Sequence, residues 1–377
     1  MNKFHCLLFL FFLSFCQIRA TDLPDSTRFQ KLSNSRLVHF FTGHKYLISP
    51  YLLYMPETNW VFGAGVKRFL NAGGENDTLT RVSNTAVFLQ YSLNQQIIFE
   101  HNYQIFTNKE KYYVFGFYGF SRFPVYYYGA GKDARLENQE QITYDLIRFD
   151  NLTLRKIRPY TFAGLGWRFF NMYNIHGQPN GIMEKENVSG SQGSRISGLN
   201  ASVLYDSRDN VLTTSNGIFA QIEFSYHAGF TGSTHNFQRW MIDLRKFIKP
   251  FKNREDVIAF QAYSMLNNGD VPFNELGLLG GDMIMRGYYL GSYRDKNLLA
   301  FQGEYRLQVL KRWGLAGFAG MGKVDESISG LNFQNVLPSY GAGLRFKINR
   351  KENVNLRIDY GFGNGQQNLY FFIAEAF

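Results

Sequence analysis

The sequence has 377 residues, of which 17% are aromatic, while the hydrophobic fraction is an ordinary 45% and the formal net charge is +10. Its only cysteines are Cys6 and Cys16, so residues 21–377 exclude a disulfide framework, a thiolate metal site and a cysteine nucleophile. Basic residues are dispersed without a recognisable nucleic-acid-binding module, which excludes nucleic acid as an expected partner. Some lie in short connections, such as 252–254, where they would meet lipid head groups or simply solvent.

The first twenty residues have the pattern of a secretory signal peptide. Lys3 supplies a positive charge, residues 7–13 are apolar, and Ala20 is a small residue at a suitable cleavage position. The apolar stretch is shorter than the roughly 20 residues that a membrane-spanning helix needs. Lipid attachment at Cys16 is a weaker alternative, because the bulky Phe15 precedes it where a small residue is required. We expect residues 1–20 to be removed on export.

Segments in which apolar and polar residues alternate recur from residue 46 to the end of the sequence. Within 301–309, for example, an apolar face from Phe301 to Val309 alternates with a polar face from Gln302 to Gln308. This period of two predicts β-strands with two different faces. We count sixteen such segments, at approximately 46–55, 58–70, 79–93, 95–108, 111–121, 139–156, 157–172, 194–207, 216–228, 234–249, 254–266, 295–310, 312–322, 337–349, 352–364 and 367–377.

The connections between these segments also have a pattern. In a membrane barrel with an even number of strands and both ends in the periplasm, connections after odd-numbered strands face outside and are the longer set. The longest connections here all follow odd-numbered segments: 122–138, 173–193, 267–294 and 323–336. The sequence therefore predicts an all-β fold, a single 16-stranded antiparallel transmembrane β-barrel with a long sixth extracellular loop, rather than a soluble sandwich or propeller. The barrel would span 46–377, preceded by a short periplasmic segment at 21–45.

The final segment has alternate apolar residues, including Phe371 and Ile373, and the sequence stops at Phe377. This ending resembles the signal by which outer-membrane barrels are recognised and inserted by the barrel-assembly machinery, which is then a partner during folding. An aromatic residue at this point can lie in the girdle of rings at the membrane interface. The pattern predicts the outer membrane of a Gram-negative bacterium as the location.

Two further motifs resemble those of one family of barrels. The long sixth loop contains Arg286, Gly287 and Tyr288. The turn between the eighth and ninth segments contains Asp206, Arg208, Asp209, Asn210 and Gly217. Together with the strand count, these motifs are similar to those of the bacterial surface antigen family, which includes BamA and TamA. In that family an Arg-Gly-aromatic motif lies at the tip of the sixth outside loop of a sixteen-stranded barrel.

The resemblance implies a role for the loop motif. The loop would fold into the lumen, where the guanidinium of Arg286 would make planar, bidentate hydrogen bonds to the barrel wall. Gly287 would permit a tight tip, and Glu304 is the candidate partner of Arg286, because alternation places it on the polar face. The family often has an Asp in a Phe-x-Asp-x-Gly pattern on the thirteenth strand, whereas 318–322 contain no acid. Arg286 would therefore lack one expected partner.

The resemblance also implies a function, the insertion or translocation of polypeptides. Pro50 in the first segment cannot donate to a ladder, so this strand should pair weakly with the last one at the closing seam. Residues 21–45 are too few to form the periplasmic POTRA modules of that family, so a separate periplasmic partner protein would deliver clients. A small-conductance channel or solute transporter, partly plugged by the sixth loop, is the alternative.

An enzyme is a third class of function that the sequence disfavours. Residues 21–377 contain six histidines, and none lies in a recognisable nucleophile or zinc motif: His39, His44, His101, His176, His227 and His235. We therefore expect no catalytic residue, no metal and no cofactor.

Overall fold

The computed structural model describes residues 46–55, 59–70, 72, 80, 81, 83–93, 95–131, 134, 136–211, 213–349 and 354–377. The expected signal peptide and the segment at 21–45 lie outside the described residues. All structural statements below concern the described part of the chain.

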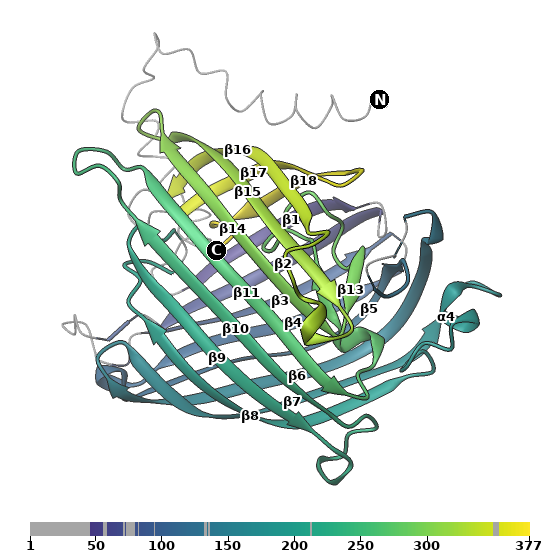
Figure 1. The fold of residues 1–377 in the computed structure, drawn as a ribbon. Helices are drawn as coiled ribbons and strands as arrows, with labels where there is room; N and C mark the ends of the chain where they lie inside the picture. Colours follow the sequence, from purple (N-terminus) through teal and green to yellow (C-terminus); the bar gives the residue numbers. More distant parts are fainter. Residues whose placement is uncertain are drawn as a thin grey trace.

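A single sheet of 16 antiparallel strands curls around a central space, and each strand pairs with the next one along the chain (Figure 1). The one interruption follows β11, which pairs directly with β14, because β12 and β13 form a separate two-stranded sheet. The strands are β1 (Tyr46–Met55), β2 (Asn59–Leu70), β3 (Ser83–Ser92), β4 (Ile97–Phe106), β5 (Tyr112–Tyr127), β6 (Glu140–Arg158), β7 (Thr161–His176), β8 (Ser194–Asp206), β9 (Gly217–His227), β10 (Phe237–Ile248), β11 (Val257–Gly269), β12 (Gly277–Leu279), β13 (Tyr293–Asp295), β14 (Asn297–Gln308), β15 (Trp313–Asp325), β16 (Leu337–Asn349), β17 (Val354–Gly363) and β18 (Gln366–Ile373). The predicted all-β class with sixteen sheet strands is confirmed.

Helical structure among the described residues is confined to short connections. It comprises η1 (Asn108–Glu110), η2 (Leu136–Asn138), α4 (Ile182–Lys185), η3 (Gly229–Thr231), η4 (Phe273–Glu275) and η5 (Ile328–Gly330). In the portion of the chain that the structure describes, no helix has the length and apolar character needed to cross a membrane.

The alternation seen in the sequence separates an outer face from an inner face. On β14, Phe301 and Tyr305 are exposed on the outside of the sheet, whereas Gln302 and Glu304 are buried on the inside. Successive side chains of a strand point to opposite faces, so one strand supplies both an apolar exterior and a polar interior. This arrangement is that of a membrane barrel rather than of a soluble protein with a dry core.

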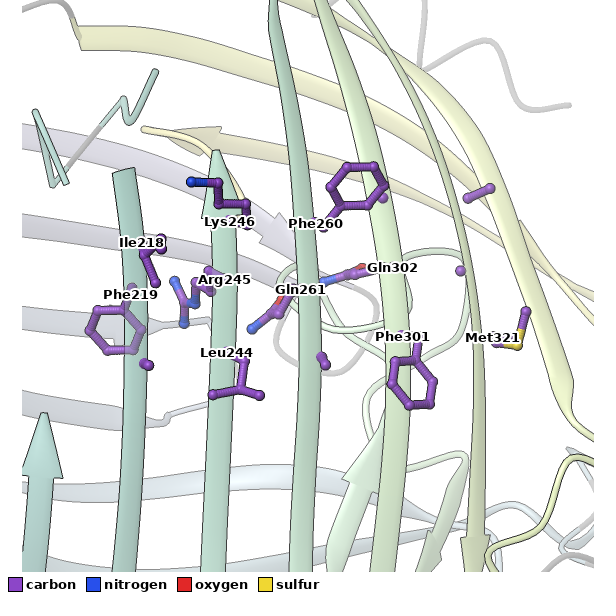
Figure 2. Close-up of a pocket in the computed structure, with 15 residues that line it drawn as sticks. Ile218, Phe219, Leu244, Arg245, Lys246, Phe260, Gln261, Phe301, Gln302 and Met321 are labelled. Carbon is purple, nitrogen blue, oxygen red and sulfur yellow. Dashed lines mark hydrogen bonds between the residues drawn. The ribbon is translucent and has the colours of Figure 1, made fainter. Parts of the chain in front are cut away.

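The outer face is hollowed where β9, β10, β11, β14 and β15 run side by side. Leu244, Phe260 and Phe301 are exposed on this face, whereas the small Ala262 and Gly303 lie between them. The result is a hollow of about 650 Å³ on the outer surface, lined largely by apolar atoms (Figure 2). Because it opens away from the lumen, this hollow is part of the apolar belt and not a site for a polar ligand.

The two ends of the sheet are not joined. Among the described residues, β1 pairs only with β2 and β18 pairs only with β17, so no ladder closes the barrel. Pro50 lies in β1, as predicted, and is paired with Ala64 of β2 in the β1–β2 ladder. The sheet therefore has two edges whose backbone groups are available for further pairing.

Several predicted strand ends differ from the observed ones by three residues or more, and two of them have a clear local cause. β5 continues to Tyr127 rather than stopping near residue 121, although Pro124 lies in the added part. The proline is tolerated because the β4–β5 ladder ends at Ser121, so beyond that point β5 pairs only with β6 and one edge needs no donors. β18 stops at Ile373, and the chain then turns inward, so Phe377 is not in the last strand.

Candidate functional site

The sixth outside loop, residues 270–296 between β11 and β14, folds back along the inner wall. Leu279, Met285 and Tyr288 in this loop are completely buried, and they pack against Leu298 and Ala300 on the inner face of β14. β12 and β13 form a short hairpin that brackets the loop tip, residues 280–292. The tip therefore lies inside the sheet and is held there by an apolar cluster as well as by polar contacts.

Arg286 lies at the centre of these polar contacts. Its Nη2 donates to Glu304 Oε2 at 2.5 Å, and its Nη1 donates to Asp359 Oδ2 on β17. The guanidinium carbon also lies 3.6 Å from the ring centroid of Phe318 on β15. Arg286, Glu304 and Asp359 have no exposed side-chain surface. A planar cation sandwiched in this way between two carboxylates and a ring is a role for which Lys has no equivalent geometry.

Three further arginines surround the same two carboxylates. Arg306 Nε donates to Glu304 Oε1 at 2.6 Å, and Arg345 bonds to Asp359 while its Nη2 lies 3.4 Å from Glu304 Oε1. Arg357 Nη1 lies 3.3 Å from Asp359 Oδ2 and its Nη2 lies 3.2 Å from Asp282 in the loop. The loop tip and three wall strands, β14, β16 and β17, thus share one array of charges, and β15 adds the ring of Phe318. Glu304 and Asp359 each contact three of these arginines.

Gly287 and Tyr288 connect the loop tip to the last strand. Tyr370 Oη on β18 accepts a hydrogen bond from Gly287 N at 2.9 Å, and Asn368 Nδ2 donates to Gly287 O at 2.9 Å. Tyr288 Oη donates to Pro338 O on β16 at 2.6 Å. Gly287 has φ +116°, and a Cβ at this position would lie only 2.4 Å from the backbone carbon of Phe362. Only glycine allows the loop tip to approach β17 so closely.

A second anchor fixes the start of the loop. The Glu275 carboxylate, in η4, lies 2.6 Å from Nη2 of Arg239 on β10 and 3.4 Å from Nη1 of Arg168 on β7. Burial alone raises the pKa of Glu275, but the charges of Arg239 and Arg168 outweigh this effect and hold the pKa at about 2. Glu275 therefore stays ionised throughout the physiological pH range, so this anchor does not act as a pH switch.

The turn motif between β8 and β9 forms a compact structural unit at the other end of the barrel. Asp206 accepts two hydrogen bonds from Arg208, from Nε at 2.8 Å and Nη2 at 3.1 Å. Asp209 Oδ1 accepts from the backbone of Ser215 at 2.9 Å. Asn210 Oδ1 accepts from Thr213 N at 2.9 Å, and Gly217, with φ +119°, packs against the backbone of Ser207. These residues determine the shape of the turn and do not contact the loop tip in any described interaction.

Residues at the end of the chain divide between the two faces. Phe371 is exposed on the outer face of β18. The sequence predicts Phe377 in the aromatic girdle at the membrane interface. The structure instead places it in the lumen, buried beside Phe247 of β10. The expectation was wrong because β18 ends four residues earlier, and Ala374, with φ +81°, redirects the chain inward.

The sequence indicated Arg286 and Glu304 but missed Asp359. The absence of an acid at 318–322 suggested that Arg286 would lack a partner, whereas β17 supplies that acid from a different strand. Alternation places Asp359 on the same face as Asn355 and Arg357, and this row of polar residues was the available signal. Which inward-facing row meets the loop tip depends on the stagger of the strands, which alternation does not specify.

The fold and the loop together define an outer-membrane β-barrel whose sixth loop is anchored inside the lumen. A family model described as the Omp85 superfamily domain matches residues 71–377. The chain belongs to the Omp85 superfamily, and its location is the cell outer membrane. No curated protein sequence matches it significantly.

Solved structures of similar fold include BamA from Haemophilus ducreyi lacking POTRA domains 1–3, with a TM-score of 0.58 and 12% sequence identity over 87% of this chain and 69% of that one. CdiB from Acinetobacter baumannii has a TM-score of 0.54 and 14% identity over 87% of this chain and 59% of its own. CdiB from Escherichia coli has a TM-score of 0.55 and 12% identity over 88% of this chain and 62% of its own. Identities this low support a shared fold, and this chain spans less than two thirds of either CdiB protein.

Proposed function

We propose that this barrel inserts or translocates polypeptides across the outer membrane, with a separate periplasmic protein as its delivery partner. The observation that carries the proposal is the unpaired seam. β1 and β18 each present an edge without a described partner strand, and an incoming strand can add to such an edge through backbone hydrogen bonds. The superfamily assignment and the fold of BamA and CdiB support the same function.

The anchored loop supports this proposal, because its described contacts hold the β18 side of the seam. Gln366, Asn368 and Tyr370 on the inner face of β18 all bond to the loop region. Side-chain contacts from the loop therefore fix β18, whereas Pro50 removes one donor from β1. An opening of the seam would then move β1 away from a stationary β18.

Locking the seam tests this function. We expect a disulfide between cysteines introduced in 46–55 and 366–373 to abolish the assembly of client proteins in cells that depend on this chain, and reductant to restore it. A matched control pair, Ser202→Cys with Glu223→Cys, joins two strands that already pair in the β8–β9 ladder and should leave assembly unchanged. If the seam-locked barrel retains full function, the seam is not where clients engage.

A mild-detergent pull-down from outer membranes tests the partner. A periplasmic protein recovered in stoichiometric amounts supports polypeptide handling by a two-component system. Recovery of the barrel alone, with full function after reconstitution, contradicts the need for a partner.

A passive channel is the second candidate, because a sixteen-stranded barrel is wide enough to hold water around a loop. Under that function we expect small single-channel conductance in a planar bilayer, rising several-fold when residues 280–292 are deleted. A matched deletion in an exposed loop, residues 328–333, should leave conductance unchanged. Recordings without a rise after the first deletion contradict a latent pore.

A further inference from the structure

The last four residues of the sequence, 374–377, occupy a defined place on the inner wall. Ala374 N donates to Asn355 O at 2.8 Å, which starts an inward turn away from the line of β18. Glu375 and Phe377 then point to the wall: 2% of the Glu375 side chain and 5% of Phe377 are exposed. In Figure 1 the C-terminal label overlies β11 and β14, and both strands contact this segment.

The wall presents a polar half of this site to Glu375. Arg345 Nε donates to Glu375 Oε2 at 2.8 Å, and Asn355 Nδ2 donates to Glu375 Oε1 at 2.8 Å. Arg306 Nε lies 3.6 Å from Oε2. The two carboxylate oxygens thus have hydrogen-bond donors from two strands, β16 and β17, with Arg306 of β14 at ion-pair distance, and the two arginines are themselves buried. A carboxylate that accepts a charge-assisted hydrogen bond on one oxygen and an amide hydrogen bond on the other is a specific contact rather than a chance one.

The other half of the site is apolar and receives the aromatic ring. Phe377 lies against Phe247, Val257 and Ala259, which are buried side chains on the inner face of β10 and β11. Arg306 Nη2 also donates to Phe377 O at 2.9 Å. Inner-facing positions of a wide barrel are normally polar, so three buried apolar side chains there form a pocket that suits a ring. The polar half and the apolar half are separated by a distance that suits a carboxylate and an aromatic ring two residues apart in sequence.

We propose that this wall is a peptide-binding site for a segment of the type Glu-x-Phe, and that the protein's own residues 375–377 occupy it as an internal competitor. A client segment of the same chemistry binds by displacing them. The identity of the client rests on the proposed function, whereas the existence of the binding site does not depend on it. Displacement of residues 375–377 would also free the end of β18 to extend along the seam. Binding of a client at the wall would in this way be coupled to the β18 edge, where an incoming strand can add.

Peptide binding to the full-length chain in detergent tests the site. The probe is a fluorescent peptide with the sequence of residues 372–377. The two proteins are the wild type and the double variant Glu375→Gln, Phe377→Ala, which weakens the internal occupant and changes no residue of the wall strands. We expect the variant to bind the peptide about tenfold more tightly or better, because a charge-assisted contact is removed from the competitor. The same peptide carrying Glu375→Gln should bind at least tenfold more weakly to that variant. Equal affinities for the two proteins, or for the two peptides, overturn the proposal.

A second measurement does not depend on how that variant folds. Residues 21–377 contain no cysteine, so the single variant Ala376→Cys reports on one position, which is 1% exposed in the wild type. We expect slow labelling by a polar maleimide, compared with Phe333→Cys in an exposed loop, and several-fold faster labelling in the presence of excess peptide. Fast labelling without peptide, or a rate that the peptide does not change, overturns the proposal. Both assays measure binding alone, so a functional seam-locked barrel would refute the proposed function while leaving their result in place.

Discussion

Replacement of Glu304 by glutamine is expected to lower the free energy of unfolding of this barrel by about 3–5 kcal/mol, the cost of removing one partner from a buried ion pair. Glu304 is fully buried and contacts Arg286, Arg306 and Arg345. Glutamine keeps the volume and some hydrogen bonds but leaves these cations under-neutralised. The destabilisation can be measured on the purified protein by gel electrophoresis, in which the folded barrel forms a heat-modifiable band. The denaturant concentration at which half of this band has disappeared should be lower for the variant.

The charge balance of the array explains why this effect should be large. Its cations and anions are equal in number: Arg286, Arg306, Arg345 and Arg357 against Asp282, Glu304, Asp359 and Glu375. Removing the Glu304 carboxylate, which has no exposed surface, leaves an uncompensated positive charge that solvent does not screen. Lys249→Gln is the control, because Lys249 and Glu255 are exposed and 3.5 Å apart, and such surface pairs contribute about 0–1 kcal/mol. Equal destabilisation by both variants would contradict the buried-array interpretation.

Replacement of Gly287 by alanine should detach the tip of the sixth loop from the wall. The new Cβ would meet the backbone of Phe362 at 2.4 Å, and backbone atoms on a paired strand have little freedom to move. A left-handed conformation would cost alanine about 1–2 kcal/mol more. We expect protease cleavage within residues 270–296 of the variant but not of the wild type, and a rise in single-channel conductance.

Gly232→Ala separates the two causes of this effect. Gly232 also has a positive φ, +90°, but a Cβ there has no atom within 4 Å. It should therefore show only the conformational cost, with no cleavage in the sixth loop. A Gly287→Ala protein with the protease pattern and conductance of the wild type would mean that the loop tip does not depend on this close approach.

Local patterns in the sequence were sufficient for the number, order and approximate ends of the strands. Alternation has a period of two residues, so it appears in any short window, and the segment predicted at 337–349 has the bounds of β16. The same parity placed Glu304 on the inner face, where Arg286 meets it. The prediction failed in β5, where nearly continuous aromatic residues hide the alternation and Pro124 resembles a stop signal.

Contacts between distant strands were decided only by the tertiary structure. Asp359 is 73 residues from Arg286 in sequence, and Phe318 lies on yet another strand. Whether these side chains reach the loop tip depends on the stagger and curvature of sixteen strands, which accumulate over the whole sheet. No short window contains that information.

The amino-acid sequence by itself therefore determined that this is an outer-membrane barrel with a long sixth loop that contains an arginine, because the period of a strand and the length of a loop are local properties. The tertiary structure alone decided that the loop bonds to β18, that the final residues turn into the lumen, and that β1 and β18 remain unpaired in the described chain. These three features arise from how the whole sheet curves, a property of the barrel rather than of any segment.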